Sequence, residues 1–138
     1  MTTPHFDSAV PSRWQAAAKF TAIALTALLA LTIAVLTLTP MSTSAASQLS
    51  DKLLHVIAFM GLVLPCAVLT PRLLKFVVPF AVTFGAAIEI IQPYVGREAE
   101  FLDFVADGVG IGIGVMLGVL LRFVFARWFH GRLRRSAG

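Results

Sequence analysis

Residues 20–38 read FTAIALTALLALTIAVLTL, a run of 19 residues without a charged side chain. An α-helix rises about 1.5 Å per residue, so about 20 apolar residues cross the hydrocarbon core of a bilayer, which is about 30 Å thick. The segment is therefore long enough to span a membrane as one helix. It is also longer than the apolar region of a cleaved signal peptide, which is about 7–15 residues.

Three more apolar segments follow, at residues 53–69, 73–91 and 104–124, and short connections separate them. Their few ionisable side chains lie near the segment ends. Four such segments predict an all-α membrane protein, a bundle of four transmembrane helices. We place the transmembrane domain at residues 20–126, between an N-terminal tail of residues 1–19 and a basic C-terminal tail of residues 127–138.

The composition excludes the other broad classes of protein. Hydrophobic residues make up 58% of the 138 residues and charged residues only 13%, whereas about 25% is usual for a soluble domain. A disordered chain would be poor in apolar residues. The single cysteine excludes a disulfide scaffold.

The basic residues predict the orientation of the bundle. Nine of the eleven lie on one side of the predicted spans, and only Lys52 and Arg97 lie on the other. The nine are Arg13, Lys19, Arg72, Lys75, Arg122, Arg127, Arg132, Arg134 and Arg135. Because cytoplasmic segments carry the excess of lysine and arginine, we expect both termini to be cytoplasmic and the protein to be multi-pass in the inner (cytoplasmic) membrane.

Two alternatives concern the ends of the chain. Ser44-Ala45-Ala46 follows the first apolar segment and could be a signal-peptidase site, which would remove that helix. The C-terminal arginines could contact nucleic acid, but the run is too short for a folded basic surface. Contact with anionic lipid headgroups explains them, so no nucleic-acid partner is predicted.

Six of the seven acidic residues, all but Asp7, gather at the predicted outer ends of the second, third and fourth helices. They are Asp51, Glu89, Glu98, Glu100, Asp103 and Asp107. Three pairs have the spacing of one helix face, namely Asp51 with His55, Glu89 with Gln92, and Asp103 with Asp107. Because helix ends joined by short loops are neighbours, we predict one outward-facing polar cluster. It comprises Asp51, Lys52, His55, Glu89, Gln92, Arg97, Asp103 and Asp107.

The depth of three members indicates where they point. His55, Glu89 and Asp107 each lie about one helical turn inside an apolar segment. Ionisable groups at that depth are costly unless they are paired or hydrated, so we expect these three to face the bundle interior. Asp51 and Asp103 could instead be helix N-caps, and Glu98 and Glu100 are interpreted as a solvated loop.

The cluster suggests several kinds of chemistry. Lys52 and Arg97 are expected to hold a phosphate or another anion. A general acid and base for catalysis could come from four candidates, His55, Glu89, Asp103 and Asp107. No metal or cofactor is predicted, because one nearby histidine is thin support for a metal site.

Glycines repeat along the fourth helix. Gly110, Gly114 and Gly118 are spaced by four, and Gly110 and Gly114 share a stripe with Asp103 and Asp107. Small residues at this spacing let helix backbones approach closely. We expect this helix to be the central one. Self-dimerisation through the glycines is the alternative, and the oligomeric state stays open.

Three motifs carry a resemblance to a known family. Asp51-Lys52-Leu53-Leu54-His55, with Phe59, resembles the D-K-x-x-H opening of the VanZ-like family. Glu89-Ile90-Ile91-Gln92 followed by Gly96-Arg97 resembles its E-x-x-Q and G-R segment. The series Asp103, Asp107, Gly110 and Gly114 resembles its D-x-x-x-N-x-x-G-x-x-x-G segment, except that Asp107 stands where many members have asparagine.

The resemblance implies a small multi-span protein of the cell envelope. The namesake of the family is associated with resistance to teicoplanin, a lipidated glycopeptide. Together with the polar cluster, this predicts a protein that binds or processes a membrane lipid or a lipid-linked glycan precursor. Two alternatives remain: an enzyme acting at the same cluster, and a structural or assembly subunit in which the cluster clamps helices together.

Overall fold

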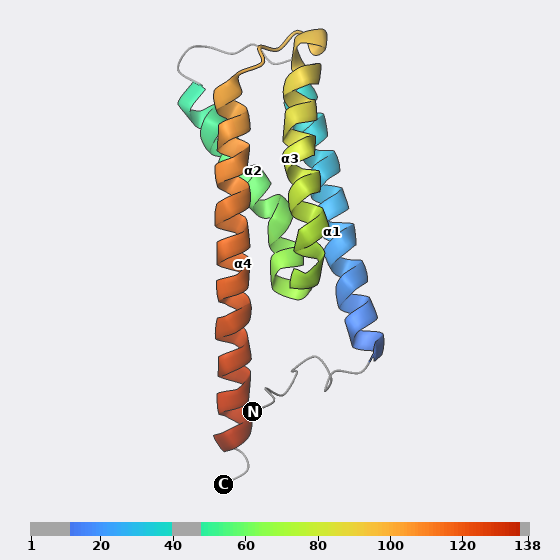
Figure 1. Ribbon diagram of the computed structural model, residues 1–138, viewed down its shortest axis with the longest axis vertical. Helices are drawn as coiled ribbons and strands as arrows, with labels where there is room; N and C mark the ends of the chain where they lie inside the picture. The colour runs from blue at the N-terminus through green and yellow to red at the C-terminus, as the bar shows by residue number, and fades with distance from the viewer. Residues whose placement is uncertain (1–11, 40–47, 136–138) are drawn as a thin grey trace.

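The computed structural model describes residues 12–39 and 48–135, and nearly all of these residues are helical, with no strand among them. The four long helices are α1 (Ser12–Leu38), α2 (Gln48–Leu69), α3 (Leu74–Ile91) and α4 (Phe101–Arg135) (Figure 1). Two short 3-10 helices, η3 (Pro71–Leu73) and η4 (Gln92–Val95), lie on either side of α3. Each long helix contains a segment long and apolar enough to cross a membrane, which confirms the predicted all-α class and its four candidate spans.

Two helices extend beyond their apolar segments. α1 begins at Ser12, ahead of residue 20, and α4 continues past residue 124 to Arg135. Alanine, glutamine and arginine are good helix formers, so the helix continues where the apolar run has ended. The Ser44-Ala45-Ala46 motif lies outside the described residues.

The central helix is α2, which packs against α1, α3 and α4 and most extensively against α4. The expectation that α4 is central is therefore wrong. The glycine stripe lets α4 approach one neighbour very closely, and that neighbour is α2. A Cβ atom at Gly114 would lie 2.5 Å from the carbonyl oxygen of Met60, and one at Gly110 would collide with the carbonyl oxygen of Val56. The glycines of α4 therefore pack against a helix of the same chain.

The core lies in the middle of the bundle and the outer faces are apolar. Phe59, Leu62 and Val63 of α2 are fully buried against neighbours that include Ala81 and Ile88 of α3. Large apolar side chains cover the outward faces of all four helices, for example Leu28, Leu54, Phe80 and Val119. An exposed apolar surface of this extent is what a bilayer would cover.

The two ends of the bundle differ in charge. α1 starts and α4 ends on one side, where the link between α2 and α3 also lies (Figure 1). A cavity of about 700 Å³ at this basic end is lined in part by Lys19, Arg72 and Arg122. Arg122 Nη1 donates to the carbonyls of Val68 and Leu69 at the end of α2, at 3.3 and 3.4 Å. The acidic residues among those that the structure describes lie at the other end, called the cluster end here.

Candidate functional site

The deepest part of the cluster end is a buried pair between α2 and α4. His55 Nδ1 lies 2.8 Å from Asp107 Oδ1, and the two side chains are only 3% and 2% exposed. Both residues face the bundle interior, as their depth in the sequence predicted. Gly85 of α3 packs beside the pair, and a Cβ atom there would lie 2.6 Å from Asp107 Oδ2. Glycine at this position therefore lets α3 close over the carboxylate.

Ion pairs surround the buried His55–Asp107 pair, which forms the floor of the cluster. Lys52 Nζ lies 2.5 Å from Glu100 Oε2 and 3.2 Å from Asp103 Oδ1, so it joins α2 to the start of α4. Arg97 Nη2 lies 3.5 Å from Asp51 Oδ2. Asp103 is buried, whereas the side chains of Asp51 and Glu100 are each 32% exposed. The cluster thus has a buried floor and a partly open rim.

The link between α3 and α4 contributes the remaining contacts. Gly96 ends η4 with φ of 77°, a left-handed conformation that glycine adopts without strain, and Arg97 follows it. Arg97 Nη1 then donates to the Leu36 carbonyl at 3.4 Å, and Gln92 Nε2 donates to the Thr37 carbonyl at 3.5 Å. The last carbonyls of α1, which have no partner within their own helix, are bound in this way.

All eight predicted residues lie at the cluster end, but three details of the prediction are wrong. Asp51 is the fourth residue of α2 and Asp103 the third of α4, so neither is an N-cap. Glu100 is not a solvated loop residue, because it pairs with Lys52 and its backbone N–H donates to Glu89 Oε2 at 3.0 Å. Glu98 is exposed, as predicted.

Sequence reasoning also missed the part played by α1. The end of α1 carries no acidic residue, so its sequence did not indicate that α1 contributes backbone carbonyls to the cluster end. Its last four carbonyls need partners in any helix, and the long polar side chains of Gln92 and Arg97 were the available donors. Spacing alone gave no signal for Gly85.

Several buried oxygens in the cluster lack a hydrogen-bond partner. Within the described part of the chain they include Glu89 Oε1, Gln92 Oε1, Asp103 Oδ1 and Asp107 Oδ2. Asp103 Oδ1 is near Lys52 Nζ but makes no hydrogen bond with it. Buried polar atoms are nearly always satisfied in proteins, so such a group of acceptors can receive hydroxyl donors or a cation.

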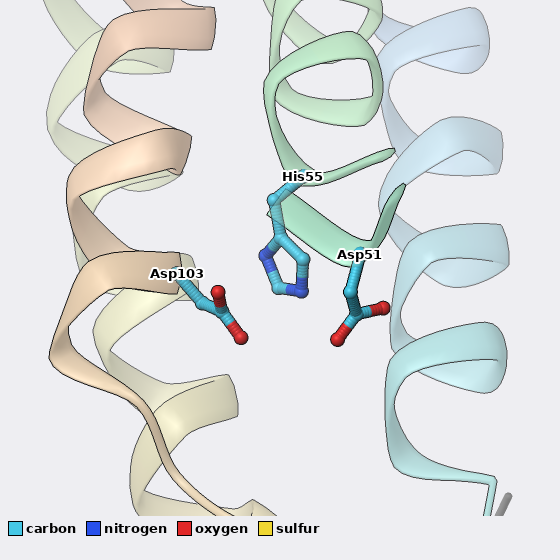
Figure 2. A group of neighbouring side chains, drawn as sticks. All are labelled: Asp51, His55 and Asp103. Carbon is cyan, nitrogen blue, oxygen red and sulfur yellow. The ribbon is translucent and has the colours of Figure 1, made fainter. Parts of the chain in front are cut away.

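The charges determine which ligands fit. Both Lys52 and Arg97 already contact carboxylates, and acidic side chains outnumber them in the cluster. A free anion would have to displace these carboxylates. His55, in contrast, has carboxylates on two sides. A ring nitrogen of His55 and one carboxylate oxygen each of Asp51 and Asp103 lie within 4.8 Å of one another. The same holds for a ring nitrogen of His55 with one carboxylate oxygen each of Glu89 and Asp107. Figure 2 shows the imidazole between Asp51 and Asp103.

No family model, curated protein or solved structure matches this chain. The VanZ-like resemblance therefore stays a prediction that rests on the three motifs, and functional conclusions depend on the site itself.

Proposed function

We propose that this chain is a VanZ-like, multi-pass protein of the inner membrane that binds, with its polar cluster facing outward, the headgroup of a lipid-linked envelope molecule. The observation that carries the proposal is the partly open polar cluster at one end of a bundle with apolar flanks. A lipid-linked molecule combines a polar head with an apolar tail, which matches this combination of surfaces. The basic residues at the opposite end support the orientation.

The unpartnered oxygens favour a headgroup that donates hydrogen bonds. Glu89 Oε1 is an acceptor without a donor, and a sugar hydroxyl can supply one. A lipid-linked glycan therefore suits the cluster better than a phosphate alone, because Lys52 and Arg97 are already paired.

Binding is tested on the full chain purified in detergent, by native mass spectrometry. The probe is a polyprenyl-pyrophosphate-linked disaccharide, and phosphatidylglycerol serves as the comparison lipid. We expect wild-type protein to prefer the disaccharide lipid, and Glu89→Gln to weaken its binding about tenfold, equivalent to about 1.4 kcal/mol. The exposed Glu98 provides a matched control, since Glu98→Gln should bind like wild type. Equal binding of both lipids, or of wild type and Glu89→Gln, would contradict the proposal.

A link to teicoplanin rests on the family resemblance. In a teicoplanin-sensitive bacterium, expression of the chain should then raise the concentration of teicoplanin needed to stop growth, and the Glu89→Gln variant should not. Unchanged susceptibility with wild-type protein in the membrane would remove this part of the proposal.

A structural or assembly subunit is the second candidate, and the bonds between helices favour it. Arg97 ties the link after η4 to both α1 and α2, through Leu36 and Asp51. If the cluster is only a clamp, Arg97→Ala should lower the amount of folded protein in the membrane while any folded fraction behaves like wild type. If the cluster binds a ligand, Glu89→Gln should leave the folded amount unchanged and lose binding.

A further inference from the structure

The cluster end carries more negative charge than its own side chains balance. Five carboxylates gather there, from Asp51, Glu89, Glu100, Asp103 and Asp107, and they face two permanent cations, Lys52 and Arg97. Ionised carboxylates that are removed from water are costly unless an opposite charge compensates them. With all five ionised, the excess is three negative charges. A cation from outside the chain would reduce it.

The environment of His55 points to the kind of cation. Its Nδ1 contacts the Asp107 carboxylate, and both side chains are buried. When Nδ1–H donates to a carboxylate, the lone pair is left on Nε2, and this is the usual arrangement of a histidine that binds a metal. Figure 2 shows the imidazole lying between the carboxylates of Asp51 and Asp103, with the ring nitrogen farther from the backbone on the side of Asp51.

We infer that His55, Asp51 and Asp103 bind a divalent metal ion of the Zn²⁺ or Mn²⁺ class, and that Asp107 is a positioning residue for the imidazole. One imidazole nitrogen and two carboxylate oxygens form a ligand set that these ions accept. The three donor atoms lie within 4.8 Å of one another. Tetrahedral donors at about 2.1 Å from one ion lie about 3.4 Å apart, so donors as far as 4.8 Å apart need to close by up to about 1.4 Å.

The neighbours of these ligands are compatible with the ion. Asp103 is buried, and its Oδ1 makes no hydrogen bond and has only the Lys52 ammonium, 3.2 Å away, as an ionic partner, which the ion would replace. Lys52 is also held by Glu100, and it keeps that partner when Asp103 turns toward the ion. Asp51 lies at the partly open rim, which provides a route of entry. Two carboxylates and a neutral imidazole balance the charge of a divalent ion.

Three protein ligands leave coordination positions open at the rim. In metal sites, open positions take water or a ligand from solution. Here the ion would add positive charge beside Lys52 and Arg97, and it would make the cluster able to hold a phosphate or hydroxyl oxygen. The metal site goes beyond the proposed headgroup binding and does not depend on it.

The test uses the full chain, purified in detergent, stripped with EDTA and then titrated with ZnCl₂ or MnCl₂ by calorimetry. Bound metal is counted by elemental analysis after dialysis. We expect one ion per chain. Asp51→Asn and Asp103→Asn should each weaken binding by at least about tenfold, and Asp107→Asn, as a positioning residue, by about 10–100-fold. Glu98→Gln is the matched control and should bind like wild type.

A second readout keeps the result clear if a variant folds poorly. A bound ion stabilises the folded state by mass action, so ZnCl₂ or MnCl₂ should raise the unfolding temperature of wild type and of Glu98→Gln, and that of Asp51→Asn clearly less at the same metal concentration. Wild-type protein that binds less than one ion in ten chains overturns the inference. So does binding that survives both aspartate substitutions, or that needs Glu89 instead. Lipid binding that persists in EDTA would leave the proposed function standing without the metal.

Discussion

Removing one member of the buried His55–Asp107 pair is expected to destabilise the bundle by about 3–5 kcal/mol, because the other member is left buried without its partner. The two side chains are 3% and 2% exposed, so water does not replace the lost contact. We expect His55→Leu to show this loss, measured as the free energy of unfolding of purified protein in detergent. The transition can be followed by circular dichroism.

A double-mutant cycle separates the pair from the general effect of a changed core. His55→Leu combined with Asp107→Leu should recover most of the stability lost in the single variants, since neither polar side chain is then left buried without its partner. Asp107→Asn should lose much less than Asp107→Leu, because the amide oxygen still accepts a hydrogen bond from the imidazole. If the losses in the free energy of unfolding of the two single variants simply added in the double variant, the 2.8 Å contact between His55 and Asp107 would contribute nothing to stability.

Gly110→Ala is expected to destabilise the protein by about 2 kcal/mol, the usual range for overpacking being about 1–3 kcal/mol. The added Cβ atom would meet the Val56 carbonyl oxygen and would lie 3.1 Å from the Met60 backbone nitrogen. These are backbone atoms of α2, so no side-chain rotation relieves the clash and the two helices must separate. The measurement is again the free energy of unfolding in detergent.

Gly112 supplies a matched control on the same helix. A Cβ atom at Gly112 meets nothing within 4 Å. Alanine exceeds glycine in helix propensity by about 1 kcal/mol, so Gly112→Ala should be neutral or stabilising. The two positions lie about half a turn apart. Changes of opposite sign in the free energy of unfolding would show that the close packing of α2 on α4, rather than the loss of glycine itself, causes the destabilisation at Gly110. Equal effects at both positions would refute that explanation.

Much of the candidate site was predictable because the chemistry of the helix ends is local. The pairs Asp51–His55 and Asp103–Asp107 have the spacing of one helix face, and antiparallel helices with short links bring such ends together. Glu100 was misjudged because its distance along the chain from Lys52 says nothing about which side chain it meets. The pairing of both cations, which changes the expected ligand, was likewise not visible in the spacing.

The sequence by itself determined the four apolar segments, their helical state and the gathering of acidic groups at one end. These features follow from length, hydropathy and the period of the helix, which neighbouring residues set. Only the tertiary structure decided that α2 is central, that the glycines of α4 face it, and that His55 meets Asp107 beneath a rim of ion pairs. Those features depend on how each helix is rotated and tilted about its axis. Packing between side chains of distant segments decides that, and no single segment contains the information.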